Sequence, residues 1–391
     1  MKTLIELYDD SPIENVLAAD TFLPERIVYL CPTEIAQDKD KQQKLKEYFS
    51  HRGLETELLF LETSLFYAGK VEKQLRQVTE TYPDCAIDIA GGSDAALFAS
   101  GALSRERNVA VFTHSRKKKR FFEICNAPFA DHLPIDVKYT VEDFFLMAYG
   151  ASKAGRVENQ TLERYMDRID AFFRVFLRFR KKWNSITNWF QRASRADKNG
   201  YFTLDVSCDY TLKGERSSRI PADEEALREL EQLGFLKDLV IRRDERVSFQ
   251  FEDEQIRTWL RDQGSVLEIY TWKACRDAGI FQDVHCSIIV QWERGKGEEI
   301  VSNEIDVIAV QEATPVFISC KTCPIDTDAI NELAILRDRF GGDAARALLV
   351  STENCRAITR RRADALDIDV ITWQELRNCS LREQIRSLME K

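Results

Sequence analysis

The sequence predicts an α/β protein with a doubly wound parallel sheet in its first part and a second α/β unit at its end. In the first part, short apolar runs alternate with amphipathic helical stretches. After residue 262, three consecutive strand-like runs follow a helix. The alternation stops between these two parts, so we expect three units: residues 1–150, 151–261 and 262–391.

The first unit is expected to contain five strands with helices between them. The strands are predicted at 3–10, 26–32, 55–62, 85–92 and 109–115, and the helices at 41–52, 70–82 and 93–103. In doubly wound sheets, ligands bind beyond the carboxyl ends of the strands. The loops after these strands are therefore the first place to look for a ligand site.

The middle unit begins with a long helical stretch, 160–195, which is followed by a strand pair at 201–212. A helix at 222–233 ends at Gly234, and two strands surround Asp244 and Glu245. A helix followed by a hairpin resembles a winged-helix unit. A helical linker with a β-ribbon explains the same pattern equally well.

The last unit reads helix (265–278), strand (285–292), turn (294–297) and two strands (300–310 and 315–320). A helix at 328–340, a strand at 347–350, another helix, a strand at 369–372 and a final helix complete it. The order is α-β-β-β-α-β.

Charge and hydropathy exclude several classes of protein. The net charge of −9 provides no global field for nucleic acid, so such contact must be local. Two patches are candidates: 116–120 (RKKKR), where a solvated helix face is the simpler explanation, and 173–182 (FRVFLRFRKK), where arginines mix with aromatic residues. No apolar run has the length of a membrane span, and the N-terminus is neither a signal peptide nor an anchor, so we expect a soluble, cytoplasmic protein.

Cysteine and glycine patterns exclude some cofactors. The ten cysteines are scattered, mostly in apolar runs, as is usual for buried thiols in a reducing compartment. Cys320 and Cys323 form a CxxC without a second pair, so a structural zinc is not expected. Neither a GxGxxG fingerprint nor a Walker-type loop is present.

The strands at 300–310 and 315–320 hold residues that suit metal-assisted chemistry. Glu304 and Asp306 are two residues apart and are expected on one strand face, as are Ser319 and Lys321 on the next strand. A carboxylate at the edge of an apolar core needs a cation or a donor. We expect Glu304, Asp306 and the helix-borne Glu268 to hold Mg²⁺ or Mn²⁺, with Lys321 stabilising charge during phosphodiester hydrolysis.

Two loops of the first unit suit an anionic ligand. One contains Asp10, Ser11 and Pro12; the other is Gly91-Gly92-Ser93-Asp94, at the start of a helix, with Thr113 and His114 expected near the same edge. The glycines allow close approach of a backbone, Ser93 suits the N-cap, and a helix N-terminus offers free N–H groups. A plain strand-to-helix turn would have the same sequence features.

The C-terminal pattern resembles the PD-(D/E)xK motif of the restriction-endonuclease-like superfamily. Asp306, Ser319 and Lys321 fall at the motif positions, and Glu268 matches the acidic residue that many members carry before the strands. The resemblance implies catalytic roles for Glu268, Asp306, Ser319 and Lys321. The chain departs from the motif at Ser319, where the second carboxylate is usual. The alternative is an inactive nuclease-like domain with an Asp–Lys ion pair.

With this C-terminal unit, the first unit resembles the CARF domain, the Rossmann-like sensor of CRISPR-linked proteins. The order of units resembles the CRISPR ancillary nucleases. That resemblance implies a homodimer activated by a cyclic oligoadenylate, typically cyclic tetra-adenylate, bound at the two loops. It also implies metal-dependent cleavage of DNA, RNA or both in type III CRISPR defence. The competing hypothesis is a nucleotide-sensing regulator that binds DNA through a winged helix and has an inactive nuclease domain.

Overall fold

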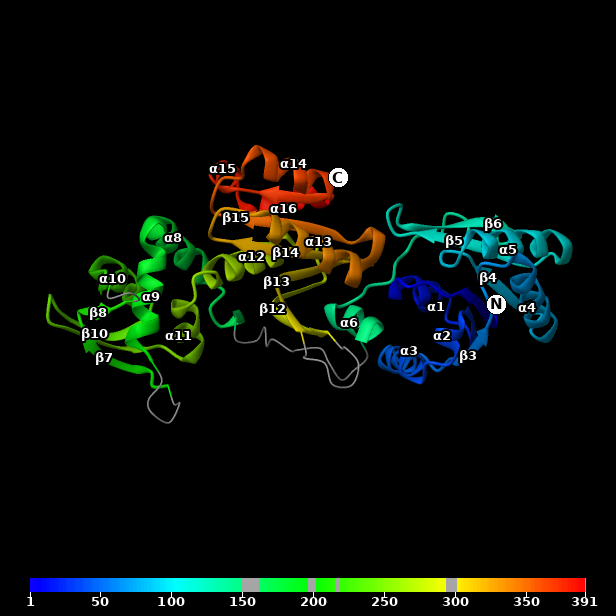
Figure 1. Ribbon diagram of the computed structural model, residues 1–391, viewed down its shortest axis with the longest axis horizontal. Coiled ribbons are helices and arrows are strands. Elements are labelled where there is room, and N and C mark those ends of the chain that lie inside the picture. Colours follow the sequence, from blue (N-terminus) through cyan, green and yellow to red (C-terminus); the bar gives the residue numbers. More distant parts are fainter. Residues whose placement is uncertain (150–161, 196–201, 215–217, 293–300, 391) are drawn as a thin grey trace.

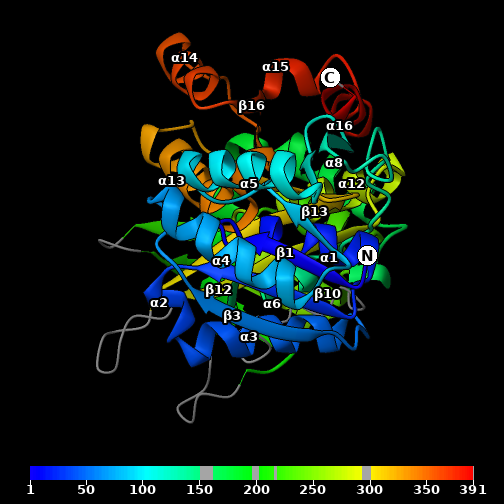
Figure 2. The same cartoon turned by 90° about the vertical axis from the view of Figure 1, so that its right-hand side faces the viewer.

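The computed structural model describes residues 1–149, 162–195, 202–214, 218–292 and 301–390, and its elements form three groups in a row (Figure 1). The C-terminal elements, yellow to red, lie between the N-terminal elements, blue to cyan, and the middle elements, green. The last part of the chain is therefore the centre of the molecule. Figure 2 turns the N-terminal elements toward the viewer.

The N-terminal sheet has the strand order β3-β2-β1-β4-β5-β6 among the described residues. Its strands are β1 Thr3–Leu7, β2 Arg26–Cys31, β3 Glu57–Glu62, β4 Cys85–Asp88, β5 Ala110–Ser115 and β6 Arg120–Cys125. The first five pair in parallel, and β6 is antiparallel to β5. This is a Rossmann-like order, in which β2 and β3 lie on one side of β1 and β4 and β5 on the other, so that the strand order reverses between β1 and β4. The five predicted strands are confirmed, whereas β6 was not expected.

Helices cover both faces of this sheet. The set is η1 Pro12–Asn15, α1 Leu17–Phe22, α2 Thr33–Ala36, α3 Lys39–His51, α4 Ala68–Thr81 and α5 Asp94–Arg107. Alternate residues of a strand face opposite sides. Ile5 and Leu7 accordingly pack in the core with α4 and α5, and Leu4 packs in the core with α1 and α3. The sheet is thus doubly wound, as predicted.

The basic run 116–120 is not a solvated helix face. It forms the turn between β5 and β6, and Lys119 has a positive φ of 53°. Arg116 is buried, only 5% exposed, and engages in ion pairing instead of facing solvent. The prediction was wrong because a run of like charges gives no sign of which member turns inward.

The middle elements contain helices on either side of small sheets. They are α8 Ile169–Phe179, η2 Arg180–Lys182, α9 Trp183–Ala193, β7 Asp205–Asp209, β8 Thr211–Lys213, β9 Arg219–Pro221, α10 Glu224–Gln232, β10 Leu236–Arg242, β11 Arg246–Phe251 and α11 Glu254–Arg261. A three-stranded sheet has the order β10-β11-β7, and β8 pairs with β9. The helix followed by the β10-β11 hairpin agrees with the winged-helix pattern, while α11 was missed.

The helical stretch expected at 160–195 is broken in the structure. Residues 160 and 161 lie outside the described residues, and η2 separates α8 from α9. Most side chains of the run 173–182 make contacts within the protein. Phe173, for example, stacks on Tyr270 with ring centroids 3.7 Å apart, and Arg180 donates to the Thr352 carbonyl at 2.6 Å. The aromatic residues of this run build core, which weakens the case for a nucleic-acid patch there.

The C-terminal sheet has the order β12-β13-β14-β15-β16. Its elements are α12 Ser265–Ala278, β12 Asp283–Trp292, β13 Val301–Gln311, β14 Thr314–Lys321, α13 Thr327–Gly341, η4 Gly342–Ala344, β15 Arg346–Ser351, α14 Ala357–Ala365, β16 Ile368–Ile371, α15 Trp373–Leu376 and α16 Leu381–Met389. The α-β-β-β-α-β order is confirmed. The turn expected at 294–297 and residue 300 lie outside the described residues.

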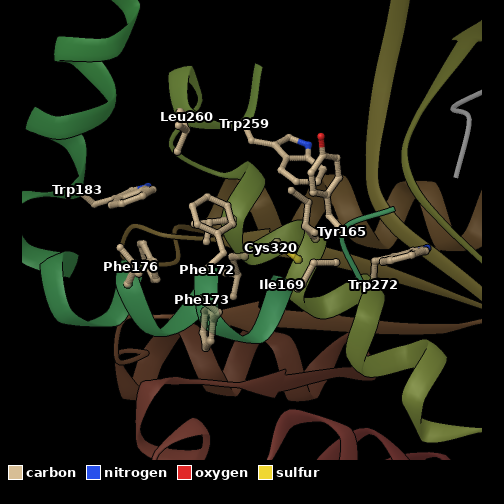
Figure 3. Close-up of a cluster of buried hydrophobic side chains, with 14 of the residues drawn as sticks. Tyr165, Ile169, Phe172, Phe173, Phe176, Trp183, Trp259, Leu260, Trp272 and Cys320 are labelled. Carbon is tan, nitrogen blue, oxygen red and sulfur yellow. The ribbon is translucent and has the colours of Figure 1, made fainter. Parts of the chain in front are cut away.

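One hydrophobic core joins the middle elements to the C-terminal sheet (Figure 3). Phe172, Trp183 and Trp259 belong to the middle elements, and Trp272 and Cys320 to α12 and β14, yet all pack in one cluster. The two groups therefore share their interior and have no independent cores. Burial of aromatic side chains of this size is among the largest contributions to stability.

A second core joins the N-terminal sheet to the opposite face of the C-terminal sheet. Helix α6, Val141–Tyr149, lies at this junction, and Phe145 meets Phe340 of α13 edge-on with ring centroids 5.9 Å apart. The C-terminal sheet is thus covered by a different neighbour on each face.

No helix in the described residues is long and apolar enough to cross a membrane.

Because the middle and C-terminal elements share one core, a cavity made in one should loosen the other. We expect Phe173→Ala to lower the free energy of unfolding by about 3–5 kcal/mol and to speed amide hydrogen exchange in both α8 and α12. Phe98→Ala, at a side chain 74% exposed on α5, is the control and should change neither. Faster exchange confined to α8 would contradict a shared core.

Candidate active site and ligand pocket

The predicted catalytic side chains come together beside the C-terminal sheet. Helix α12 carries Glu268, β13 carries Glu304 and Asp306, and β14 carries Ser319 and Lys321. The charges of Asp306, Glu304 and Lys321 all act on the pKa of Glu268, which places the four ionisable groups within electrostatic range of one another. The structure thus brings these predicted side chains into one region, and their catalytic roles stay a prediction.

Asp306 is held by the neighbouring strand. Its Oδ2 accepts from the Cys320 backbone N–H at 2.7 Å and from the Ser319 hydroxyl at 3.2 Å. Burial raises the pKa of Asp306, and the hydrogen bond from Cys320 opposes that rise. Ser319, which stands where the motif usually has a carboxylate, thus orients Asp306.

Glu268 lies between the start of α12 and strand β12. Its Oε2 accepts from the Ser287 hydroxyl at 3.4 Å. Its Oε1 lies 2.6 Å from the point where a Cβ on Gly264 would stand, so a side chain at Gly264 would displace it. Burial, and then the negative charge of Asp306, raise the pKa of Glu268 to about 8.

Strands β12 and β13 change their packing at the level of Asp306. Cys286 and Val307 belong to the core shared with the middle elements, while Ile288 and Ile305 belong to the core shared with the N-terminal sheet. Residues two apart on a regular strand face the same side, so the hairpin must twist sharply here. Ser287, in the middle of this change, has a φ of 53°, a conformation that serine rarely adopts.

The donor chemistry of the cluster fits a hard divalent cation. Glu268, Glu304 and Asp306 are oxygen donors, and the negative charge of Asp306 raises the pKa values of both glutamates, a repulsion that a cation would relieve. Within the described ranges, however, no three Asp, Glu, His or Cys side chains are grouped closely enough to hold a metal ion. The side chains would therefore have to draw together around a metal.

A pocket of about 1120 Å³ opens at the carboxyl end of β1, where the strand order of the N-terminal sheet reverses. It contains four of the predicted ligand residues, Asp10, Gly92, Ser93 and Asp94. Lys70 and Lys73 of α4 also line it and are exposed; they are cations that the sequence analysis did not select. Further lining residues come from the β2 and β3 loops, including Thr33, Thr63, Ser64 and Phe66.

The Gly91-Gly92 turn is required by the fold itself. A Cβ on Gly91 would stand 2.4 Å from the Leu7 carbonyl oxygen, and Gly92 has a φ of 90°. Ser93 is the N-cap of α5 and accepts from the Ala96 N–H at 3.3 Å, as expected. A bulky substitution at Gly92 would thus disturb β1 as well as the pocket.

Five of the predicted ligand residues do not line the pocket: Ser11, Pro12, Gly91, Thr113 and His114. The His114 ring is buried between Glu14 (Nε2–Oε2, 2.7 Å) and Asp88 (Nδ1–Oδ2, 3.3 Å). Arg116 binds the other oxygen of Glu14 through Nε at 2.9 Å. These residues form a buried ionic network under the loop that contains Asp10.

This network contacts the C-terminal unit directly. Arg116 Nη1 donates to the Gly341 carbonyl at 3.0 Å, and a Cβ on Gly342 would stand 2.4 Å from Ser11 Oγ. Gly341 ends α13, the helix that also carries Glu332, whose charge raises the pKa of Asp306. Helix α13 therefore extends from the carboxylate cluster to the loops behind the ligand pocket (Figure 1).

Residues 253–390 match the family model described as "Card1-like, endonuclease domain". The expected resemblance of the C-terminal unit to a nuclease is confirmed by this match. The match contains every carboxylate of the cluster, together with Ser319 and Lys321. It begins at α11, slightly before the boundary expected at 262.

Two solved structures have the same fold over nearly the whole chain. Protein VC1899 from Vibrio cholerae is 18% identical, with a TM-score of 0.75 over 99% of this chain and 98% of that one. Can2 from Sulfobacillus thermosulfidooxidans, in complex with cyclic tetra-adenylate, is 15% identical, with a TM-score of 0.67 over 99% and 96%. The order of all three units is therefore shared with these proteins. No protein with a curated description matches the sequence.

Several residues around the two sites were missed. Asp262, Ser287 and Glu332 surround the carboxylate cluster, and Lys70 and Lys73 line the pocket. Only the lysines gave a usable signal, since they lie three residues apart on a predicted helix and hence on one face. The other three become significant only through contacts between distant parts of the chain.

The His114 network predicts a pH-dependent stability. Burial lowers the pKa of His114, but the neighbouring charge of Asp88 and the bonds to both carboxylates outweigh it and raise the pKa to about 9. A raised pKa stabilises the fold below the unfolded value, and this contribution is lost as pH rises through the folded value. Despite its burial, Glu14 has a pKa lowered to about 2 by His114 and Arg116, so its contribution is lost only in strong acid.

We therefore expect the free energy of unfolding to fall between pH 7 and pH 10 by on the order of 1–3 kcal/mol. The His114→Gln variant, which keeps hydrogen-bonding capacity without a titrating ring, should lack that component. Urea unfolding at several pH values measures both. Parallel pH profiles for the two proteins would show that His114 is not charged in the fold.

Proposed function

We propose that this protein is a metal-dependent nuclease activated by a cyclic oligoadenylate that binds at the N-terminal sheet. The observation that carries the proposal is the meeting of Glu268, Glu304, Asp306 and Lys321 inside a region that matches an endonuclease family. The fold shared with Can2, a protein solved with cyclic tetra-adenylate, supports the choice of activator.

At the carboxylate cluster, Glu268, Glu304 and Asp306 would hold Mg²⁺ or Mn²⁺, which supplies charge neutralisation and an activated water for phosphodiester cleavage. Ser319 and the Cys320 N–H fix the direction of the Asp306 carboxylate. Lys321 offers an ammonium group to the negative charge that develops on the phosphate. Ser287, on strand β12, donates to the Glu268 carboxylate and so positions it.

At the N-terminal pocket, Lys70 and Lys73 would meet the ligand's phosphates. Phe66, 82% exposed at the pocket wall, offers a ring face to an adenine. A ring-shaped ligand has repeated, equivalent phosphates, so a two-fold homodimer would contact it with the same residues from both subunits. We propose cyclic tetra-adenylate as the ring and one ring per homodimer.

Helix α13 would couple the two sites. A ligand activates only if it binds the active arrangement more tightly than the resting one. The loop from Asp9 to Ser11 begins at the pocket and reaches Gly341 and Gly342, at the end of α13. Helix α13 also carries Glu332, whose charge acts on Asp306. A shift of that loop therefore has a direct route to the carboxylates.

The metal requirement is tested at Asp306. We expect Asp306→Asn to lower the cleavage rate by about a thousandfold or more, because the carboxamide keeps an acceptor for the Cys320 N–H but loses the charge. Asp328→Asn, at an exposed carboxylate on α13, is the matched control and should cleave normally. Rates are measured on labelled DNA and RNA with Mg²⁺, with Mn²⁺ and with chelator.

Full cleavage in excess chelator would contradict the proposed requirement for a divalent metal. Wild-type protein that binds the cyclic oligoadenylate and nucleic acid but cleaves neither DNA nor RNA would support the competing hypothesis of a regulator with an inactive nuclease domain. The serine at position 319, where the motif usually has a second carboxylate, would then explain the lack of cleavage.

The ligand pocket is tested at Lys73. Reversal of a charge that contacts a phosphate should weaken binding of cyclic tetra-adenylate by about tenfold or more. Lys73→Glu should do so, whereas Lys41→Glu, at an exposed lysine on α3 outside the pocket, should not. Titration calorimetry measures both affinities and the number of rings per dimer. Equal affinity in the two variants would place the ligand elsewhere.

The coupling is tested at Gly342. A Cβ there would press on Ser11 and Arg116 and so wedge the two units apart. We expect Gly342→Ala to reduce the ratio of cleavage rates with and without ligand by about fivefold or more. Gly279→Ala has a similar positive φ, 67° against 62°, but nothing within 4 Å of its Cβ. The two glycines differ in ψ, 18° at Gly279 and −165° at Gly342, so Gly279→Ala controls for a glycine-to-alanine change away from the contact and not for the strain at Gly342. Equal stimulation in both variants would exclude this contact from the coupling.

A further inference from the structure

A second, smaller pocket lies beside the carboxylate cluster. It has a volume of about 450 Å³ and is lined by the end of α9, the end of α11 and the residue that follows α11; the residues are Gln191, Arg192, Arg195, Thr258, Arg261 and Asp262. Helices α9 and α11 belong to the middle elements, next to α12 (Figure 1). The function proposed above makes no use of this pocket.

The pocket adjoins the candidate active site through Asp262. Asp262 Oδ2 and Glu268 Oε1 both lie within 3.4 Å of the point where a Cβ on Gly264 would stand. The charge of Asp262 also raises the pKa of Glu268. A ligand in the pocket is thus one side chain away from the carboxylates.

Arginines dominate the pocket and its inner wall. Arg257 and Arg261 are four residues apart on α11 and so lie on one helix face, while Arg192 lies in the last turn of α9 and Arg195 just beyond the end of that helix. Arg257 stands directly behind Arg261, and its positive charge, together with burial, lowers the pKa of Arg261. Guanidinium groups placed this closely favour an anion between them.

Two buried donors of these arginines have no acceptor within the described ranges of the chain. They are Nη1 of Arg257, a residue only 7% exposed, and Nε of Arg261. Glu254 occupies the other side of the Arg257 guanidinium. Buried donors without acceptors are unfavourable, and a phosphate oxygen in the pocket would satisfy the donor of Arg261, which lines it, with a charge-assisted bond.

Asp262 adds one negative charge to the lining of the pocket, and its carboxylate is directed toward the start of α12. Its Oδ2 accepts from the N–H groups of Gly264 at 2.8 Å and Ser265 at 2.7 Å. Phe202 keeps the guanidinium groups of Arg257 and Arg261 together, with their carbons 4.1 and 4.8 Å from its ring centre. The basic character of the pocket is thus fixed by the structure around it.

We propose that this pocket binds a backbone phosphate of the nucleic-acid strand that the neighbouring carboxylates cut, an assignment that rests on the nuclease function proposed above. A protein with a net charge of −9 repels a polyanion unless a local site attracts it. The arginines at 192, 195 and 261 provide that site at one side chain's distance from Glu268. They hold a phosphate next to the scissile one and so fix the strand across the cluster.

The test uses the full chain and a labelled oligonucleotide in chelator, so that binding is measured without cleavage. We expect the double variant Arg195→Glu with Arg261→Gln to bind it about tenfold more weakly or worse, and the slope of affinity against salt to fall by about one to two contacts. Arg228→Glu, at an exposed arginine on α10 outside the pocket, is the matched control and should bind like the wild type. Thermal unfolding and binding of cyclic tetra-adenylate should be unchanged in all three proteins.

Equal oligonucleotide affinity and equal salt slopes in the double variant and the control overturn the proposal. A loss of affinity in the double variant alone supports it. Because the readout is binding, it is independent of the nuclease assignment. If the wild type cleaves no nucleic acid, the proposed function fails, while the comparison of affinities still decides whether the pocket binds a strand.

Discussion

The C-terminal sheet depends on having both of its faces buried by other parts of the chain. One face packs in the core with α8, α9 and α11, and the other packs in the core with α6 and the N-terminal sheet. A sheet buried on both sides cannot hold charged groups except at its ends and irregularities. The carboxylate cluster lies where β12 and β13 change from one core to the other, marked by the positive φ of Ser287.

The same arrangement connects the two candidate sites. Because the N-terminal sheet is packed directly on the C-terminal unit, no flexible linker has to transmit the presence of a ligand. The Gly341 carbonyl accepts from Arg116, which is fixed by Glu14 and through it by His114. Interfaces built from a few discrete polar contacts can switch between two arrangements, as allosteric coupling requires.

Much of the fold was predictable because it follows local patterns. The alternation of apolar runs and helices gave the doubly wound sheet, and α12 was predicted at its observed bounds, Ser265–Ala278. The pairs Glu304–Asp306 and Ser319–Lys321 could be selected because a two-residue spacing on a strand determines which side chains share a face. Glu268 was selected because it lies on the helix before these strands and matches the acidic residue of the resembled superfamily.

What could not be predicted depends on contacts between distant segments. The inward turn of Arg116 depends on Glu14 and Gly341, neither of which is near it in sequence. The arginine pocket is assembled at the ends of two helices about 70 residues apart, with no basic run to reveal it. Conversely, the run 173–182 was conspicuous in sequence, but its aromatic residues face the core. Composition shows which groups are present, and only packing shows which of them remain exposed.

The central claim is that a ligand at the N-terminal sheet controls phosphodiester cleavage at the carboxylate cluster. The most direct measurement is the rate at which the full wild-type chain cleaves labelled DNA and RNA in Mn²⁺, with and without cyclic tetra-adenylate. The account predicts a rate at least about tenfold higher with the ligand, as expected for ordinary allosteric coupling. Equal rates with and without a ligand that demonstrably binds would contradict it.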